Sequence, residues 1–165
     1  MNLLYSFGLK NIPIVDVTIL AFGFVLRVLY GGLLLDIEIS NWLFLTVLSV
    51  SFYMALGKRN NELKKLKDGK TRSVLKQYTQ EFLDKNMYVF LGLSIVFYSL
   101  WATMGVSGSL FRYSVIFVIL IVMKYSLNLE GDSLGDPIDV LLHDYVLIAL
   151  VVLYGLYCFG ALYLF

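Results

Sequence analysis

Two cations and a carboxylate stand together where an apolar stretch of the sequence becomes polar. In SFYMALGKRNNELKK (residues 51–65) the apolar residues end at Gly57, and Lys58, Arg59 and Glu62 follow. If a helix continues for one more turn, Lys58 and Glu62 form an i,i+4 pair, and Arg59 and Glu62 form an i,i+3 pair. This face is typical either of a solvated helix end or of half of a phosphate-binding site, because basic side chains neutralise phosphate charge.

A second group of charges, all acidic, precedes the last apolar stretch. The segment LNLEGDSLGDPIDVLLHDY (residues 127–145) contains no lysine or arginine, and its carboxylates are Glu130, Asp132, Asp136, Asp139 and Asp144. Magnesium prefers carboxylate oxygens and usually joins one or two of them to substrate phosphates. Together with the basic residues, this loop suggests a site for a phosphorylated or pyrophosphorylated substrate. The alternatives are a basic loop that signals topology or contacts anionic lipid, and an acidic loop that is simply solvated.

Two ionisable residues interrupt the first apolar stretch. Arg27 lies about fifteen residues into the expected helix, and a charge at that depth is a candidate for function. Asp16 is eleven positions earlier, on nearly the same helical face but about 16 Å away, so Arg27 needs a partner from elsewhere. The alternative is an internal ion pair or hydrogen bonds to carbonyls that lock helices together. Lys124, near the end of a later stretch, can extend its side chain to the membrane surface.

Long apolar stretches carry these residues. The chain has 165 residues, of which 59% are hydrophobic and 15% charged, and this is too apolar for one soluble domain of ordinary composition. The stretches approach the ~20 residues that a helix needs to cross a bilayer. They run from Ile12 to Leu35, Trp42 to Gly57, Asn86 to Met104, Phe111 to Tyr125 and Tyr145 to Phe165. We therefore predict one domain over residues 1–165, an all-α polytopic membrane bundle of about five transmembrane helices.

The distribution of the cations predicts the orientation of the chain. Most of the 13 lysines and arginines lie between the second and third apolar stretches. The positive-inside rule places that loop in the cytoplasm. Counting helices outward places Lys10 and the acidic loop on the same side. We expect a multi-pass protein of the cell inner (plasma) membrane whose active face is cytoplasmic, with no nucleic-acid partner.

Four blocks of the sequence carry a resemblance to a known family. They are YSFGLKNIPIVDVTILAFGFVLRVLYGG (residues 5–32), FYMALGKRNNEL (52–63), LKQYTQEFLD (75–84) and GDPIDVLLHDYVL (135–147). Together they resemble the UbiA superfamily of polyprenyl-substrate transferases, and within it the decaprenyl-phosphate phosphoribosyltransferase branch. The resemblance covers nearly the whole chain, and four ordered blocks are more specific than any single one.

This resemblance implies an all-helical bundle whose central cavity binds a polyprenyl chain and a diphosphate donor complexed with Mg2+. Ordinary prenyltransferases of the superfamily have Asp-x-x-x-Asp where this chain has Lys58-Arg59-Asn60-Asn61-Glu62. The basic version is similar to the phosphoribosyl branch, whose donor is phosphoribosyl diphosphate and whose acceptor is a polyprenyl phosphate. We therefore expect a transferase of the 5-phosphoribosyl group. The alternatives are a UbiA-type aromatic prenyltransferase and a non-catalytic membrane subunit.

The sequence also departs from the family pattern. Lys124 stands where Arg is expected before a tyrosine, and Tyr145 stands where Arg is expected after Asp144. The family normally opens with further helices and an Asn-Asp-x-x-Asp-x-x-x-Asp motif that is expected to hold magnesium, and these residues contain no such motif. The chain is therefore similar to the C-terminal part of a nine-helix enzyme. We expect it to be inactive alone and to associate with an N-terminal half or a second copy.

The charges and the resemblance together give the candidate site residues. The expected catalytic residues are Lys58, Arg59 and Glu62, and Glu62 is also a possible metal ligand. The other candidates share a place near the expected cytoplasmic face or within an apolar stretch. They are Lys10, Arg27 and Lys124 for substrate phosphate, and Asp16, Asp136 and Asp139 as residues that line the site.

Overall fold

A computed structural model of the chain describes residues 11–64, 73–105, 110–131 and 137–163. Every regular element in these ranges is helical. The five long helices are α2 (Val15–Leu34), α3 (Asn41–Lys64), α4 (Gln80–Leu100), α5 (Ser114–Glu130) and α7 (Tyr145–Tyr163). The short ones are η3 (Ser73–Gln77), η4 (Trp101–Gly105), η5 (Phe111–Tyr113) and α6 (Pro137–Leu142). Two candidate residues, Lys10 and Asp136, lie outside the described residues.

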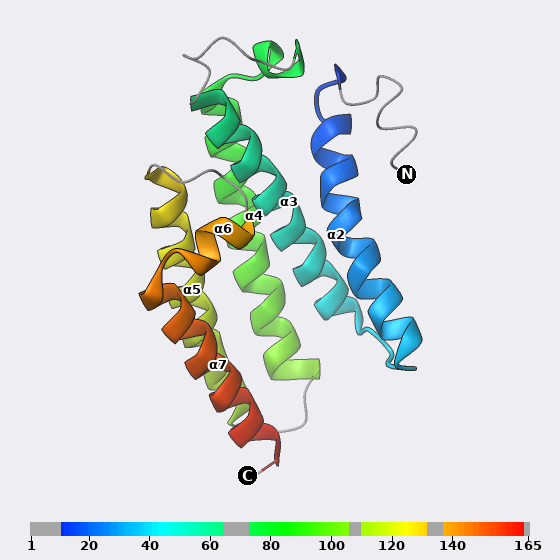
Figure 1. Ribbon diagram of the computed structural model, residues 1–165. Helices are drawn as coiled ribbons and strands as arrows, with labels where there is room; N and C mark the ends of the chain where they lie inside the picture. The colour runs from blue at the N-terminus through cyan, green and yellow to red at the C-terminus, as the bar shows by residue number, and fades with distance from the viewer. Residues whose placement is uncertain (1–10, 65–72, 106–109, 132–136, 164–165) are drawn as a thin grey trace.

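The long helices run up and down beside one another (Figure 1). The α2–α3 connection and the end of α7 lie at one end of the bundle, whereas the starts of α2 and α4 and the end of α3 lie at the other. Helix α3 packs between α2 and α4, and α5 packs mainly against α7. This alternation agrees with the predicted threading, in which the basic loop and the start of the first apolar stretch share one side.

Four helical segments are long and apolar enough to cross a membrane, and they are Val15–Leu34, Gln80–Met104, Phe111–Glu130 and Tyr145–Tyr163. This confirms the predicted all-α membrane bundle. Several helix ends differ from the prediction: α2 and α5 begin later than expected, whereas α3 ends later and α4 begins earlier. For example, α4 begins at Gln80, before the expected Asn86, since the Thr79 hydroxyl caps it by accepting a hydrogen bond from Phe82 N at 3.2 Å.

The remaining expected span, Trp42 to Gly57, lies within α3, which is not among those four segments of the described chain. Helix α3 continues past Gly57 and buries polar side chains, including Ser49 and Ser51. Their hydroxyls donate to the carbonyls of Leu45 and Val47 at 2.8 and 2.6 Å, so these polar groups are satisfied within the helix itself. Helix α3 is therefore an inner helix, shielded by α2 and α4, that can carry polar residues deep into the bundle.

The main hydrophobic core surrounds the middle and the polar end of α3. Its buried members come from several helices and include Val17, Tyr53, Leu56, Leu83 and Leu129. Gly57 allows a close approach here, because a Cβ atom at this position would lie 3.0 Å from Leu129 Cδ1. The core thus fixes α2, α4 and α5 around the turn of α3 that bears Lys58, Arg59 and Glu62.

Candidate functional site

A buried ion pair joins the start of α2 to the end of α3. The guanidinium of Arg59 donates from Nε to Asp16 Oδ2 at 2.5 Å and from Nη2 to Asp16 Oδ1 at 2.9 Å. Both side chains have 0% exposure. A two-bond arginine–carboxylate contact of this kind fixes orientation as well as charge. Asp16 lies in the first turn of α2, where the helix dipole also favours a carboxylate.

Glu62 completes the charge cluster from one turn further along α3. Arg59 Nη1 donates to Glu62 Oε2 at 2.5 Å, which confirms the i,i+3 pair predicted from the sequence. Burial opposes the charge on Arg59, but the hydrogen bonds and negative charges of Asp16 and Glu62 outweigh it and raise the pKa of the guanidinium. Arg59 therefore stays charged. Glu62 remains 25% exposed, so it is the member of the cluster that solvent can reach.

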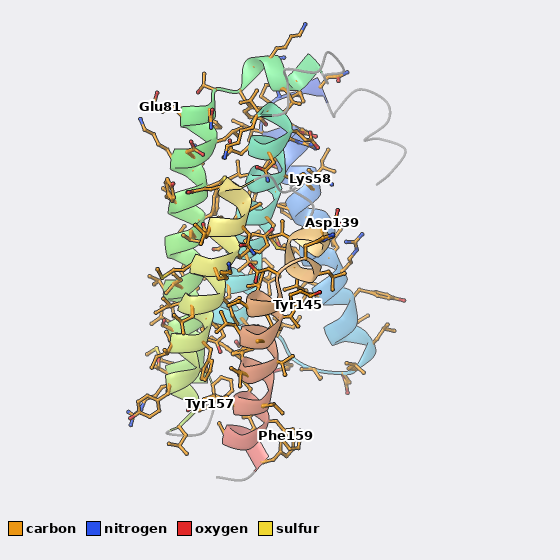
Figure 2. The ribbon with its side chains drawn as sticks, turned by 60° about the vertical axis from the view of Figure 1, so that its left-hand side comes forward. Lys58, Glu81, Asp139, Tyr145, Tyr157 and Phe159 are labelled. Carbon is orange, nitrogen blue, oxygen red and sulfur yellow. The ribbon has the colours of Figure 1, made fainter. Side chains whose placement is uncertain are left out.

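Lys58 precedes Arg59 and is partly buried. Successive residues of an α-helix point about 100° apart, so Lys58 lies on the face of α3 next to the one that carries Arg59. Figure 2 shows Lys58 above Asp139 of α6, in the half of the bundle that holds the end of α3. Asp139 is likewise partly buried, and its carbonyl accepts a hydrogen bond from His143 N at 3.1 Å.

Arg27 lies on the outer surface of α2. Its side chain is exposed, and its guanidinium carbon lies 5.5 Å from the centroid of the Phe24 ring. Asp16, which spacing had excluded as its partner, pairs with Arg59 instead. The role of Arg27 as a phosphate contact stays a prediction.

Lys124 meets a carboxylate of the acidic loop. Its Nζ lies 2.7 Å from Asp144 Oδ2, and Asp144 Oδ1 accepts hydrogen bonds from Val146 N and Leu147 N at 2.8 and 3.0 Å. Asp144 is thus both the N-cap of α7 and the partner of a cation on α5. The bond from Lys124, supported by that from Leu147 N, lowers the pKa of Asp144 to about 2.

This lowered pKa predicts how the stability of the chain depends on pH. The pKa of Asp144 in the folded protein lies below its ordinary value of 3.8, so its charge stabilises the fold above about pH 4. That contribution should disappear as the pH falls from about 4 to about 2. We expect Asp144→Asn, which keeps an N-cap, to melt at a lower temperature than the wild type at pH 7 and at the same temperature near pH 2. Thermal unfolding of the detergent-solubilised chain measures this.

The matched control for this prediction is Lys124→Met. Because the lysine supplies the largest part of the pKa shift, Asp144→Asn should have a smaller effect in the Lys124→Met background. Equal melting temperatures of wild type and Asp144→Asn at pH 7 would show that the ion pair contributes nothing to stability.

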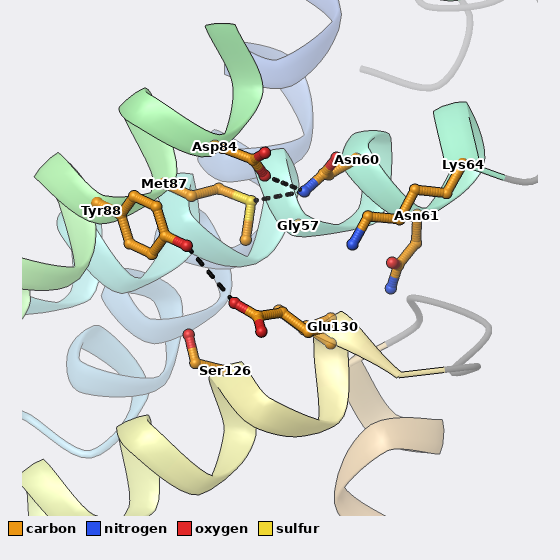
Figure 3. Close-up of a pocket in the computed structure, with 10 residues that line it drawn as sticks. Gly57, Asn60, Asn61, Lys64, Asp84, Met87, Tyr88, Ser126 and Glu130 are labelled. Atoms are coloured by element: carbon orange, nitrogen blue, oxygen red, sulfur yellow. Dashed lines mark hydrogen bonds between the residues drawn. The ribbon is translucent and has the colours of Figure 1, made fainter. Parts of the chain in front are cut away.

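A polar cleft lies between α3, α4 and α5 (Figure 3). Asn60 Nδ2 donates to Asp84 Oδ1 at 2.6 Å, and Tyr88 Oη donates to Glu130 Oε1 at 3.5 Å. Asn61, Lys64 and Ser126 also line the cleft. Its free space is about 20 Å3, enough for one water molecule. The sequence analysis did not select Asn60 or Asp84, although both lie in blocks that carry the family resemblance.

An apolar pocket of about 190 Å3 lies between α3, α4 and α5 and is also lined by α6 and α7. It is lined by side chains that are almost all apolar or aromatic, namely Val50, Tyr53, Met54, Ser94, Ile121, Val122, Tyr125, Leu141 and Leu147. The hydroxyls of Tyr53 and Ser126 lie 2.7 Å apart, so this hydrogen bond joins a wall of the apolar pocket to a wall of the polar cleft. The bundle therefore offers adjacent apolar and polar spaces.

No group of three or more His, Cys, Asp or Glu side chains that could hold a metal ion occurs in the part of the chain that the structure describes. Magnesium is usually held by one or two carboxylates together with substrate phosphates. Glu62, partly exposed beside two cations, has the chemistry of one such ligand.

Comparison with curated proteins identifies relatives. The chain is 31% identical over 151 residues to the decaprenyl-phosphate phosphoribosyltransferase of Mycobacterium tuberculosis, an alignment covering 89% of this chain and 50% of the relative. The proteins of the same name from Mycolicibacterium smegmatis and Corynebacterium glutamicum are each 30% identical, over 160 and 155 residues. Over 89% of its length, this chain is similar to proteins named decaprenyl-phosphate phosphoribosyltransferase. No family model matches it.

This similarity confirms the resemblance found in the sequence. The chain spans about half the length of the curated relatives, covering 50% of the two mycobacterial proteins and 46% of the corynebacterial one. The ion-paired end of α3 lies in the Lys58-Arg59-x-x-Glu62 block. Among the residues that the structure describes, the two buried charged side chains, Asp16 and Arg59, meet here.

Proposed function

We propose that this chain forms part of a membrane transferase that moves a 5-phosphoribosyl group from phosphoribosyl diphosphate to a polyprenyl phosphate. The similarity of 89% of the chain to proteins named decaprenyl-phosphate phosphoribosyltransferase carries this proposal. Because those relatives are about twice as long, we expect transfer to need further helices, supplied by an N-terminal half or by another copy of the chain. The chain alone should be inactive.

In this proposal the end of α3 holds the diphosphate of the donor. Lys58 supplies a positive charge from α3. Three further cations are proposed to contact substrate phosphate, namely Lys124, Arg27 and Lys10. Arg59 contributes its charge from a buried position, where Asp16 and Glu62 fix its orientation. Asp16, Asp136 and Asp139 would line the site. Preorganised charges of this kind stabilise the negative charge that develops in a transition state.

Magnesium is the cofactor in this proposal, and Glu62 is the residue that fits it best. Its carboxylate reaches solvent while Arg59 holds one of its oxygens, which leaves the side chain oriented for a ligand. When bound, magnesium supplies charge neutralisation on the departing diphosphate. Lys58 and Arg59 would share that task.

The reaction is a displacement at the anomeric carbon of the ribose. An oxygen of the lipid phosphate bonds to this carbon, and the bond from the carbon to the diphosphate oxygen breaks. The bonding electron pair leaves with the diphosphate. No base is required, since a phosphate is already ionised at neutral pH.

The adjacent apolar pocket suits the hydrocarbon chain of the acceptor. Its lining is almost entirely apolar, and its volume of about 190 Å3 can take part of a polyprenyl chain. The Tyr53–Ser126 hydrogen bond lies where this apolar pocket adjoins the polar cleft. A lipid phosphate needs both surroundings, an apolar one for its hydrocarbon chain and a polar one for its phosphate. We propose that the donor site faces the cytoplasm at the plasma membrane, following the distribution of cations.

Transfer of labelled ribose phosphate tests the proposed function. Membranes would hold this chain alone, the N-terminal half of the M. tuberculosis relative alone, or both, and would receive labelled phosphoribosyl diphosphate, decaprenyl phosphate and magnesium. We expect lipid-extractable label only with both halves. Label from this chain alone would refute the requirement for further helices. No label with both halves, after co-purification has shown that they associate, would overturn the proposed function.

A further inference from the structure

The chain adopts a strained turn immediately before α2. Ile14 has φ 67° and ψ −47°, and Val15 N donates to Pro13 O at 2.8 Å. These values describe a classic γ-turn, which is rare and strained. A positive φ is unusual for any residue with a side chain and is an outlier for a β-branched one such as isoleucine. Such a conformation persists only where surrounding contacts hold it.

Tyr78 provides the contact that holds this turn from a distant part of the chain. Ile14 N donates to the Tyr78 hydroxyl at 2.6 Å, across 64 positions of sequence. Tyr78 is itself fixed, since it is only 6% exposed and its ring stacks on Phe82 with centroids 6.0 Å apart. Val74 and Leu75, in the short helix η3 that precedes Tyr78, are buried in the main core. Tyr78 is thus an anchor attached to the core.

The turn sets the position of Asp16. Asp16 is two residues beyond Ile14, and Asp16 N donates to Ile12 O at 3.1 Å across the turn. Its carboxylate must meet both Nε and Nη2 of Arg59, so a small shift of the α2 start would break one of those bonds. Burial raises the pKa of the Tyr78 hydroxyl and the negative charge of Asp16 raises it further, as expected for a phenol that lies close to this carboxylate.

We propose that Tyr78 is a positioning residue for the charge cluster at the end of α3. Its hydroxyl holds the γ-turn at Ile14, the turn places Asp16, and Asp16 keeps Arg59 buried and oriented beside Glu62. Ile14 is 62% exposed, so its side chain packs little against the core, and the bond from its backbone to the Tyr78 hydroxyl ties the turn to a distant part of the chain. The effect on catalysis, in which a misplaced Arg59 slows transfer, rests on the proposed function. The structural link from Tyr78 through Ile14 and Asp16 to Arg59 does not depend on that function.

Protection of Arg59 from an arginine reagent tests the linkage without any transfer reaction. The full chain in detergent would be treated with phenylglyoxal, and modification of Arg59 would be measured by peptide mass spectrometry, with exposed Arg112 as an internal reference. Wild-type Arg59 should react slowly because it has 0% exposure. Tyr78→Phe removes only the hydroxyl and should raise the rate at Arg59 about 5- to 10-fold, the effect of losing one hydrogen bond on local opening.

Tyr98→Phe is the matched control. Tyr98 is also 6% exposed, and it belongs to a separate hydrophobic cluster with Ala102, Phe111 and Ala161. Its hydroxyl lies 2.7 Å from Ser114 Oγ and 3.0 Å from Tyr154 Oη. This variant should lose buried tyrosine hydrogen bonds but leave Arg59 protected. Equal reactivity of Arg59 in wild type, Tyr78→Phe and Tyr98→Phe would overturn the proposal, as would equally raised reactivity in both variants.

A second variant separates positioning from general loosening. Glycine adopts positive φ without strain, so in Ile14→Gly the turn depends less on its anchor. We expect Tyr78→Phe to raise Arg59 reactivity no more than about twofold in the Ile14→Gly background, because the strain that the hydroxyl resists is gone. An undiminished effect of Tyr78→Phe in that background would contradict the proposed route through the γ-turn.

The same variants would be assayed for transfer in the two-half enzyme, which is this chain assembled with the N-terminal half of the M. tuberculosis relative. This assay tests function separately from protection. Tyr78→Phe should lower transfer in parallel with the loss of Arg59 protection, while Tyr98→Phe should not. Full transfer in Tyr78→Phe despite an unprotected Arg59 would overturn the role of Tyr78 in positioning a working site. If no variant, including the wild type, transfers label, the proposed function fails, and the protection data alone still decide whether Tyr78 positions Asp16.

Discussion

Replacing Asp16 with alanine is expected to lower the free energy of unfolding by about 3 kcal/mol. The substitution removes the carboxylate that accepts two hydrogen bonds from Arg59, whose side chain has 0% exposure. Breaking a buried ion pair by removing one partner costs about 3–5 kcal/mol, because the remaining charge loses its compensation. We place the effect at the lower end because Glu62 still pairs with Arg59. Equilibrium unfolding of the detergent-solubilised chain, followed by circular dichroism, measures the change.

Glu81→Ala provides the matched control, since it also removes one carboxylate from an ion pair. Glu81 pairs with Lys85 at 2.6 Å, but both side chains are more than 70% exposed, at 76% and 73%. Exposed pairs contribute about 0.2–1 kcal/mol, so this variant should differ little from the wild type. A double variant, Asp16→Ala with Arg59→Met, should regain part of the stability, because no charge is left buried. Equal stabilities of Asp16→Ala and Glu81→Ala would show that the buried pair is not the source of the effect.

The sequence predicted the local part of this site well. A helix that continues past Gly57 brings Arg59 and Glu62 together by its periodicity alone, and the structure confirms that pair. Four of the five predicted apolar stretches likewise match helical segments that are long and apolar enough to span a membrane. Both predictions depend on properties of one helix at a time, which sequence spacing records directly.

The partner of Arg59 could not be predicted in this way. Asp16 was compared with Arg27 on its own helix, whereas its actual partner lies 43 positions away on α3. Which faces of two helices meet depends on packing around the whole core, and a single sequence does not record that. Nor does a hydropathy pattern predict the γ-turn at Ile14, because an isoleucine at that position looks like any other apolar residue of a membrane helix.

The polar end of α3 also limited the prediction of membrane spans. A helix that buries Arg59, Asn60 and Asn61 does not have the composition of a lipid-facing span. Its neighbours α2 and α4 shield these residues, Asp16 pairs with Arg59, and Asp84 accepts a hydrogen bond from Asn60 Nδ2. Buried polar groups are tolerated where such partners exist. The residues least expected in a membrane helix are therefore the ones that make α3 the centre of the candidate site.

Replacing Lys58 with alanine is expected to lower transfer by the assembled two-half enzyme about 100-fold or more. Lys58 is partly buried on α3 next to Arg59, and in the proposed function its ammonium faces the diphosphate as negative charge develops on it. Removing one preorganised positive or donor group from such a position costs about 100- to 1000-fold in rate. Initial rates of labelled phosphoribosyl transfer, at saturating donor and acceptor, measure the loss.

Lys85→Ala is the matched control for Lys58→Ala, because Lys85 is an exposed lysine on α4 that pairs with Glu81 and lies outside the proposed site. Lys85→Ala should retain the wild-type rate, and Lys58→Arg, which restores charge with a different shape, should recover part of it. The binding of the two halves to each other must be equal in all variants, so that a lower rate reflects chemistry and not assembly. A wild-type rate in Lys58→Ala would remove Lys58 from the donor site, and the diphosphate would then have to be held by Arg27, Lys124 or the other half.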